Sequence, residues 1–282
     1  MITRYTLVND RLVPADQASV LVTDLGIQRG YGVFDFFKTL QGKPVFLEDH
    51  LDRLFNSLSS LRLPFAYSRE KLKSMLRELM NQNNIDNSGI RITVTGGYSP
   101  DGFVIAQTSN MIVTQQPLVV NNPPSGIRLI TFDHQRQLPH VKSLDYLMAI
   151  WLQSQIAEKN AQDVLYCPEG TVTECPRANF YIVTKDDRIL TPKENILKGI
   201  IRKQLFRLAD QYSIEESTIN VEDLYSAKEC FITSTTKNIL PVVQINDKVI
   251  GDGKPGTITQ LLSTSLSRLI SEHLENAIVY YA

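Results

Sequence analysis

A run of turn-forming residues near the middle of the chain, Asn121-Asn122-Pro123-Pro124-Ser125-Gly126, most limits what this sequence can fold into. Proline and glycine interrupt helices and central strands, so such a run predicts a linker between two folded parts. A chain of 282 residues is long enough for two medium-sized domains. We therefore expect one domain at residues 1–118, an interdomain linker at 119–126 and a second domain at 127–282.

Both halves mix helix-like and strand-like segments. Helices are expected over 48–62 and 67–81, where leucines recur every three or four residues, and Ser68 is a candidate N-cap. Further helices are expected over 143–158, 199–211 and 257–271. Strands are expected at 4–9, 11–14, 32–40, 44–47, 90–95, 111–114, 127–132, 164–167, 171–173, 180–183, 188–190, 230–233 and 242–245. Because strict strand–helix–strand alternation is missing, we expect two α/β-type domains with mixed (α+β) sheets.

Charge and cysteine content exclude several classes of protein. A net charge of −1 and a pI of about 6.4 give no bulk attraction to nucleic acid or to an anionic membrane. Cys167, Cys175 and Cys230 fit neither a zinc pattern nor a disulfide framework, so we expect reduced thiols and no metal site. The first ten residues lack the apolar core of a signal peptide, and no run of 18 apolar residues occurs. We expect a cytoplasmic protein without a membrane span.

Two residues suggest covalent amine chemistry, although each also has an ordinary structural explanation. Lys142 follows a loop at 135–141 and is expected to open a helix, where it could attack an aldehyde if its amine is kept neutral. Glu174 is expected to end a strand, and a buried carboxylate can hold a proton on a pyridine nitrogen. Taken alone, Lys142 could be a surface lysine and Glu174 a turn residue. Together they match what a pyridoxal-phosphate (PLP) enzyme requires.

Two later segments have the composition of a phosphate-binding site. Gly199-Ile200-Ile201 is expected to begin a helix, whose free N–H groups and positive end attract a dianion. Thr233-Ser234-Thr235-Thr236 ends an apolar strand and offers hydroxyl donors. Arg53 lies one position from the apolar stripe of its helix. It could clamp the same phosphate or extend from the helix face to solvent.

Together these segments resemble the class IV aminotransferases, the fold-type IV PLP enzymes, over nearly the whole chain. The resemblance is carried by residues 24–35, His50-Leu51-Asp52-Arg53-Leu54, Lys142-Ser143-Leu144-Asp145-Tyr146-Leu147, Thr173-Glu174 with Asn179, Leu197-Lys198-Gly199-Ile200-Ile201-Arg202, and 229–236 with Pro241-Val242. It implies a two-domain, mixed α/β fold like that of the D-amino-acid aminotransferases, with PLP as the cofactor. It also implies a homodimer whose shared active sites lie between the two domains.

The same resemblance implies roles for individual residues. Lys142 is expected to be the catalytic lysine, which forms a Schiff base with the cofactor and moves the substrate proton. Glu174 is expected to pair with the pyridine nitrogen. The other cofactor-binding residues, for the phosphate group and the ring hydroxyl, are Arg53, Tyr146, Gly199, Ile200, Ile201, Ser234 and Thr235.

The sequence pattern is most similar to that of the D-amino-acid aminotransferases, but their usual carboxylate-binding motif is missing. That group carries arginines and a histidine after the central strand, whereas residues 96–103 here contain neither. We hypothesise that Arg91 and Arg177, with Arg29 from a second subunit, bind the substrate carboxylate instead. The alternatives are an exposed strand face for Arg91 and a surface or interface ion pair for Arg29. The remaining expected substrate-binding residues are Phe34, where the family often has a tyrosine, and Thr236.

We therefore expect a PLP-dependent transaminase that moves an amino group between a D-amino acid and a 2-oxo acid, 2-oxoglutarate or pyruvate, by a ping-pong mechanism. One alternative is a branched-chain L-amino-acid aminotransferase, which usually has a tyrosine where this chain has Arg29. Another is aminodeoxychorismate lyase, which usually has a threonine shortly after the position of Phe34. A non-catalytic PLP-binding protein is a third, and the presence of both Lys142 and Glu174 argues against it.

Overall fold

The computed structural model describes residues 4–118 and 125–277, and contacts between residues divide them into two compact units. Unit 1 comprises residues 4–118, 141–145 and 270–277, and unit 2 comprises residues 125–140 and 146–269. Most of the expected linker, residues 119–124, lies outside the described residues. Two segments expected in the second domain, 141–145 and 270–277, make their contacts in unit 1.

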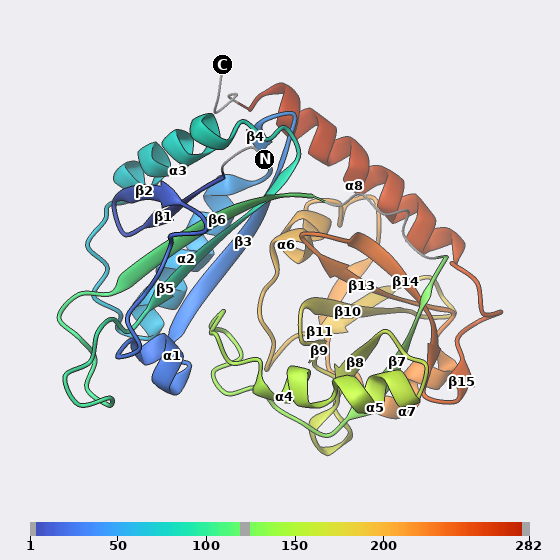
Figure 1. The fold of residues 1–282 in the computed structure, drawn as a ribbon. Coiled ribbons are helices and arrows are strands. Elements are labelled where there is room, and N and C mark those ends of the chain that lie inside the picture. The colour runs from blue at the N-terminus through green and yellow to red at the C-terminus, as the bar shows by residue number, and fades with distance from the viewer. Residues whose placement is uncertain (1–3, 119–124, 278–282) are drawn as a thin grey trace. The chain divides into compact units, whose positions relative to one another are not determined.

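Unit 1 is built on a six-stranded sheet in the order β2-β1-β6-β5-β3-β4 (Figure 1). All of its neighbouring strands are antiparallel. The strands are β1 Tyr5–Val8, β2 Arg11–Pro14, β3 Gly32–Leu40, β4 Lys43–Pro44, β5 Ser88–Thr95 and β6 Asn110–Pro117. The helices are α1 Leu25–Arg29, α2 Leu47–Ser60 and α3 Arg69–Asn83.

Helices α2 and α3 cover one face of this sheet with apolar side chains. Leu51 of α2 and Leu76 of α3 are buried in one cluster with Val33 and Phe37 of β3. Because side chains alternate along a strand, Asp35 shares this covered face. The predicted N-cap of α3 is confirmed, since the Ser68 hydroxyl accepts the N–H of Lys71 at 3.2 Å.

Unit 2 contains a nine-stranded sheet in the order β12-β11-β10-β13-β14-β7-β8, to which β9 adds beside β10 and β15 beside β14. Parallel pairs (β11–β12, β14–β7 and β7–β8) occur beside antiparallel ones, which confirms the expected mixed architecture. The strands are β7 Ile127–Phe132, β8 Asp163–Tyr166, β9 Glu174–Cys175, β10 Ala178–Val183, β11 Ile189–Pro192, β12 Ile214–Ser217, β13 Glu229–Ser234, β14 Asn238–Ile245 and β15 Lys248–Val249. The helices are α4 Leu147–Trp151, α5 Gln153–Glu158, α6 Ile200–Phe206, α7 Val221–Ser226 and the longer α8 Thr257–Glu275, with a 3-10 turn η1 at Pro168–Gly170.

The predicted helix over 143–158 is wrong at its start. Helix begins only at Leu147, because the preceding residues pair with β3. It is also divided into α4 and α5 at Leu152. Lys142 therefore does not open a helix. The helix predicted over 199–211 is also shorter, ending at Phe206.

Two predicted strands also need correction. Residues 171–173 form no strand, because Thr173 directs both its N–H and its hydroxyl to the carbonyl of Tyr166, at 2.9 and 3.0 Å. Glu174 consequently begins β9 instead of ending a strand. The strand predicted at 44–47 is shortened to β4, because α2 already starts at Leu47.

The last turns of α8, from Ile270 onward, belong to unit 1. Nε2 of His273 accepts the backbone N–H of Phe46 at 2.9 Å, where the chain leads from β4 into α2, and the two rings lie 4.5 Å apart. Nζ of Lys43 donates to the carbonyl of Leu274 at 2.7 Å. The first turn of α2 thus receives a hydrogen-bond acceptor from the C-terminal helix.

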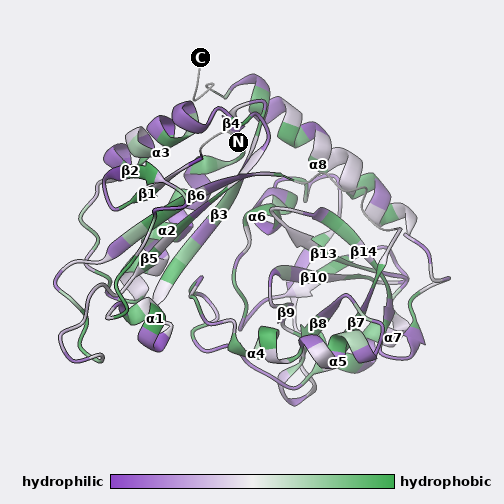
Figure 2. Ribbon diagram, viewed as in Figure 1, coloured by the Kyte–Doolittle hydropathy of each residue, from purple (hydrophilic) through white to green (hydrophobic). Residues whose placement is uncertain are grey.

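Hydrophobic and hydrophilic residues alternate along α3 and α8 (Figure 2), as expected for helices with one packed and one exposed side. None of the helices in the described part of the chain combines the length and hydrophobicity that crossing a membrane requires.

Candidate active site

The Lys142 segment is an edge addition to β3. The carbonyl of Lys142 accepts the N–H of Phe34 at 2.9 Å, and the N–H of Leu144 donates to the carbonyl of Gly32 at 3.0 Å. Gly32 permits this close approach, because a Cβ there would lie 2.6 Å from the carbonyl oxygen of Val94 and 2.8 Å from a methyl group of Leu144. Backbone pairing on a rigid strand therefore fixes the position of the lysine.

The side chain of Lys142 lies against the ring of Phe34, with Nζ 4.6 Å from the ring centroid. The guanidinium carbon of Arg91 lies 3.8 Å from the same centroid. Arg91 stands on an exposed face of β5, and its Nε donates to the Thr93 hydroxyl at 3.2 Å. Unit 1 thus brings together three predicted site residues, with two cations on one aromatic ring.

Arg53, predicted at the phosphate, is part of a buried network with Asp35 and His50. Its Nε and Nη2 donate to the two carboxylate oxygens of Asp35 at 2.8 and 2.9 Å, and Nδ1 of His50 lies 2.7 Å from Oδ1 of Asp35. Burial alone would raise the pKa of Asp35, but Arg53 and His50 outweigh it and hold that pKa far below its usual value. Burial lowers the pKa of His50 despite the attraction of Asp35.

Arg29 lies at the exposed C-terminal end of α1, where its Nη1 donates to the carbonyl of Gln28 at 3.0 Å. A short helix, unpredicted from the sequence, presents this arginine. Its N-cap Asp24 is buried and accepts the N–H of Gly26 at 2.7 Å.

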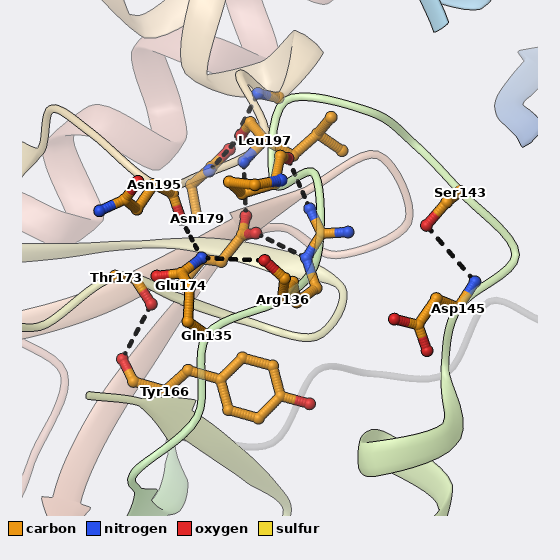
Figure 3. A network of polar contacts seen from close by, with 12 residues as sticks. Gln135, Arg136, Ser143, Asp145, Tyr166, Thr173, Glu174, Asn179, Asn195 and Leu197 are labelled. Carbon is orange, nitrogen blue, oxygen red and sulfur yellow. Dashed lines mark hydrogen bonds and ion pairs between the residues drawn. The ribbon is translucent and has the colours of Figure 1, made fainter. Parts of the chain in front are cut away.

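In unit 2 the predicted carboxylate is held by a residue that the sequence did not identify (Figure 3). Oε1 of Glu174 accepts Nε of Arg136 at 2.9 Å, and Oε2 accepts the N–H of Leu197 at 3.0 Å. Nη2 of Arg136 also donates to the carbonyl of Pro139 at 2.6 Å. The glutamate side chain is buried, 6% exposed, and the arginine side chain is nearly so, 11% exposed. The sequence offered one indication of this partner, because Arg136 lies in the loop just before Lys142.

Asn179 joins this carboxylate to the start of α6 (Figure 3). Its Nδ2 donates to the carbonyl of Leu197 at 2.7 Å, and its Oδ1 accepts the N–H of Gly199 at 3.1 Å. A Cβ at Gly199 would lie 2.2 Å from that Oδ1, so the contact requires glycine. Gly199 is the N-cap of α6 and supplies no side-chain acceptor, which leaves the first N–H groups, those of Ile200 and Ile201, for another partner.

The hydroxyl-rich segment stands where β13 ends. Ser234 and Thr235 are half-buried and Thr236 is exposed. The Ser234 hydroxyl accepts the N–H of Lys237 at 3.2 Å and lies 3.4 Å from the Thr236 hydroxyl. The Thr233 hydroxyl is buried and has no hydrogen-bond partner among the described residues. Unit 2 thus offers a buried carboxylate as an acceptor for a pyridinium N–H, and helix N–H groups and hydroxyls as donors for a phosphate.

Tyr146 and Arg177 line a second region of unit 2. Both border a hollow of about 340 Å³ beside α4 and α5, together with Asp163 at the start of β8. Burial raises the pKa of Asp163, against the opposing effects of the Val164 N–H and the positive charge of Arg177. The structure thus groups Arg177, in the exposed turn between β9 and β10, with Asp163.

Comparison with known proteins gives consistent matches. Residues 32–245 match the family described as amino-transferase class IV. A D-alanine aminotransferase of Bacillus licheniformis is 30% identical over 272 residues, which cover 94% of this chain and 96% of the relative. A putative branched-chain-amino-acid aminotransferase of Methanocaldococcus jannaschii is 32% identical over 268 residues, 90% of this chain and 92% of the relative.

The fold is shared with solved structures. A branched-chain aminotransferase from Thermoproteus uzoniensis, crystallised with norvaline, superposes with a TM-score of 0.90 at 23% identity, covering 99% of this chain and 100% of that one. At this level of identity the match supports the fold.

Proposed function

Because this chain belongs to the class IV aminotransferases, we propose that it transfers an amino group between a D-amino acid and a 2-oxo acid, 2-oxoglutarate or pyruvate, in a ping-pong reaction. The observation that supports this most strongly is the likeness to D-alanine aminotransferases along almost the whole length of both chains. The missing carboxylate-binding motif is the departure that the substrate proposal must explain.

Enzymes of this class depend on PLP. When bound, the cofactor supplies an aldehyde that receives the amino group and a protonated ring that withdraws electrons from the substrate Cα. The residues fit such a group: the buried carboxylate of Glu174 suits the ring nitrogen, and the amine of Lys142 suits the aldehyde. The residues that would hold the phosphate and the ring hydroxyl are Arg53, Tyr146, Gly199, Ile200, Ile201, Ser234 and Thr235.

Lys142 moves the proton in this proposal. Its Nζ takes the proton from the substrate Cα and returns it to the product. The backbone pairing with β3 and the contact with Phe34 hold this Nζ in one orientation. Together with the groups that hold the substrate carboxylate, this fixed direction of proton transfer determines which enantiomer presents its Cα–H to Nζ.

Arg91 is the best supported of the proposed carboxylate-binding residues. Stacking on Phe34 fixes the plane of its guanidinium, a group that can pair bidentately with a carboxylate. Arg177, Thr236 and a partner subunit's copy of Arg29 complete the proposed set. The apparent KM for the amino donor should rise at least tenfold in Arg91→Ala and in Arg177→Ala, because about 1.5–3 kcal/mol of charge-assisted hydrogen bonding is lost. A KM that barely moves in either variant would remove that arginine from the site.

A homodimer is the proposed assembly. Helix α4 exposes Leu147, Ile150 and Trp151, the last 65% accessible, and a second copy of the chain would cover such an apolar face. Sedimentation velocity should show a dimer that Trp151→Glu weakens and Val249→Glu, on the exposed strand β15, does not. A monomer at micromolar concentration would contradict the proposal.

Branched-chain L-amino-acid transfer is the second candidate, favoured by the relative from Methanocaldococcus jannaschii. The two are separated by adding one amino acid at a time to the holoenzyme and following the absorbance of the bound cofactor. D-Alanine or D-glutamate should change the spectrum, and 2-oxoglutarate should restore it. A response to L-leucine alone would establish the second candidate, and pyruvate release from aminodeoxychorismate without an acceptor would establish a lyase.

A further inference from the structure

Asp35 of β3 is a charged residue that is almost completely buried, and the proposed reaction gives it no role. Its side chain is 1% exposed, on the face of β3 that α2 covers. Four hydrogen-bond contacts surround the carboxylate: Nε and Nη2 of Arg53, Nδ1 of His50 and the N–H of Phe36 at 2.8 Å. A carboxylate with this many donors is fixed in orientation as well as in charge.

The arginine in this network is held by one edge only. Asp35 takes Nε and Nη2, and Nη2 also lies 3.4 Å from Nδ1 of His50. Within residues 4–118 and 125–277, Nη1 of Arg53 forms no hydrogen bond. A guanidinium has a rigid planar fork, so fixing one edge determines where the remaining N–H groups point.

The same face of α2 reaches the lysine segment. Ser57 follows Arg53 by four residues, one helical turn, and its hydroxyl accepts the N–H of Lys142 at 3.3 Å. The positive charge of Lys142 is among the influences that lower the pKa of His50. The unpaired edge of Arg53 and the backbone of Lys142 therefore lie along one stripe of α2.

We propose that Asp35 is a positioning residue, braced by His50, that fixes the guanidinium of Arg53 so that its Nη1 edge binds the phosphate group of the cofactor. The inference rests on the phosphate-binding role proposed for Arg53. Asp35 itself touches neither the cofactor nor the substrate and acts through the arginine.

Positioning and simple charge neutralisation predict opposite changes in the affinity for PLP when Asp35 is removed. If Asp35 only neutralised Arg53, its removal would expose an uncompensated cation and strengthen binding of a phosphate dianion. If Asp35 orients the guanidinium, its removal frees the side chain to leave the binding geometry. A charge-assisted hydrogen bond is then lost, which weakens binding roughly 10- to 100-fold.

The test compares two ligands that differ only in the phosphate. Full-length protein freed of cofactor is titrated with PLP and with unphosphorylated pyridoxal, in wild type, Asp35→Asn, Arg53→Lys and Asp52→Asn. Asp52 lies on the exposed side of the same helix, 53% accessible, and is the matched control. In Asp35→Asn, the Kd for PLP should rise roughly 10- to 100-fold while the Kd for pyridoxal changes less than about twofold; Asp52→Asn should leave both unchanged.

Each other outcome overturns a defined part of the reasoning. Equal weakening for both ligands would make Asp35 merely structural, and tighter or unchanged PLP binding would refute positioning. Unchanged PLP binding in Arg53→Lys would instead remove the phosphate role of Arg53, leaving the assigned reaction untouched. If Asp35→Asn does not fold, His50→Gln, which keeps both charges of the pair, gives the same comparison: PLP binding should weaken without a change in pyridoxal binding, and an equal effect on both would refute the proposal.

Discussion

Breaking the buried pair between Arg136 and Glu174 should destabilise unit 2 strongly. In Arg136→Met, Oε1 of Glu174 loses a donor at 2.9 Å and the carbonyl of Pro139 loses another at 2.6 Å, while Oε2 of this carboxylate, only 6% exposed, keeps the N–H of Leu197. Coulomb's law at an effective dielectric of about 20 gives roughly 6 kcal/mol for two charges at this separation. Part of this is offset because the arginine no longer has to be desolvated, so we expect a net loss of about 3–5 kcal/mol.

Urea unfolding of the full-length chain without cofactor measures the effect at pH 7.5. Arg188→Met is the matched control, because Arg188 and Asp186 are also 2.8 Å apart but are 47% and 63% exposed. That exposed pair should contribute less than about 1 kcal/mol. The double variant Arg136→Met/Glu174→Gln removes both charges. Its loss of stability should be smaller, by at least about 2 kcal/mol, than the sum of the losses in the single variants Arg136→Met and Glu174→Gln. Additive losses, or a single loss no larger than that of the control, would refute the reasoning.

Lys142→Ala should slow amino-group transfer by roughly 10²- to 10⁴-fold or more through loss of the general base, measured in single turnovers; a rate within tenfold of wild type would contradict its role. Gly32→Ala places a Cβ 2.6 Å from the Val94 carbonyl and should cost roughly 1–3 kcal/mol in urea unfolding, whereas unchanged stability would refute the close approach. The folded-state pKa of Asp35 lies below its unfolded value of about 3.9, so its stabilisation is complete above pH 3.9 and is lost as the pH falls further. The stability difference between wild type and Asp35→Asn should therefore shrink below about pH 4, and a difference unchanged at pH 3 would count against the ion pair. Burial raises the pKa of Cys167 to about 12, so iodoacetamide at pH 8 should label it only after unfolding; rapid labelling of native protein would contradict that burial.

Much of the fold could be predicted because local pattern and tertiary environment agree. The strand over Ile127–Phe132 was predicted at its observed bounds, and α2 and α3 within two residues, since leucine spacing reports directly on a buried helix face. The prediction that a helix starts at 143 was wrong because local pattern and tertiary environment disagree there. Residues 142–144 have helical propensity, but the exposed edge of β3 offers hydrogen bonds that favour an extended backbone.

Residues for the candidate site could be proposed from the sequence where one residue has one chemical role, and these roles stay predictions. Lys142, Phe34 and Arg91 are brought together in unit 1, and Glu174 is buried in unit 2. Their partners could not be identified from the sequence, because Arg136 and Asp35 act through contacts with residues 38 and 18 positions away. No local pattern encodes such distances.

The acceptor that His273 supplies to Phe46 bears on the order in which the chain can finish folding. During synthesis, β3 is made about 100 residues before residues 142–144, which pair with its edge. Helix α2 is made more than 200 residues before His273, whose imidazole accepts the N–H of Phe46 at the start of that helix. Unit 1 can therefore complete its folding only after almost the entire polypeptide has been translated. A released fragment that ends at residue 118 should consequently remain sensitive to protease, although it contains every strand of the sheet.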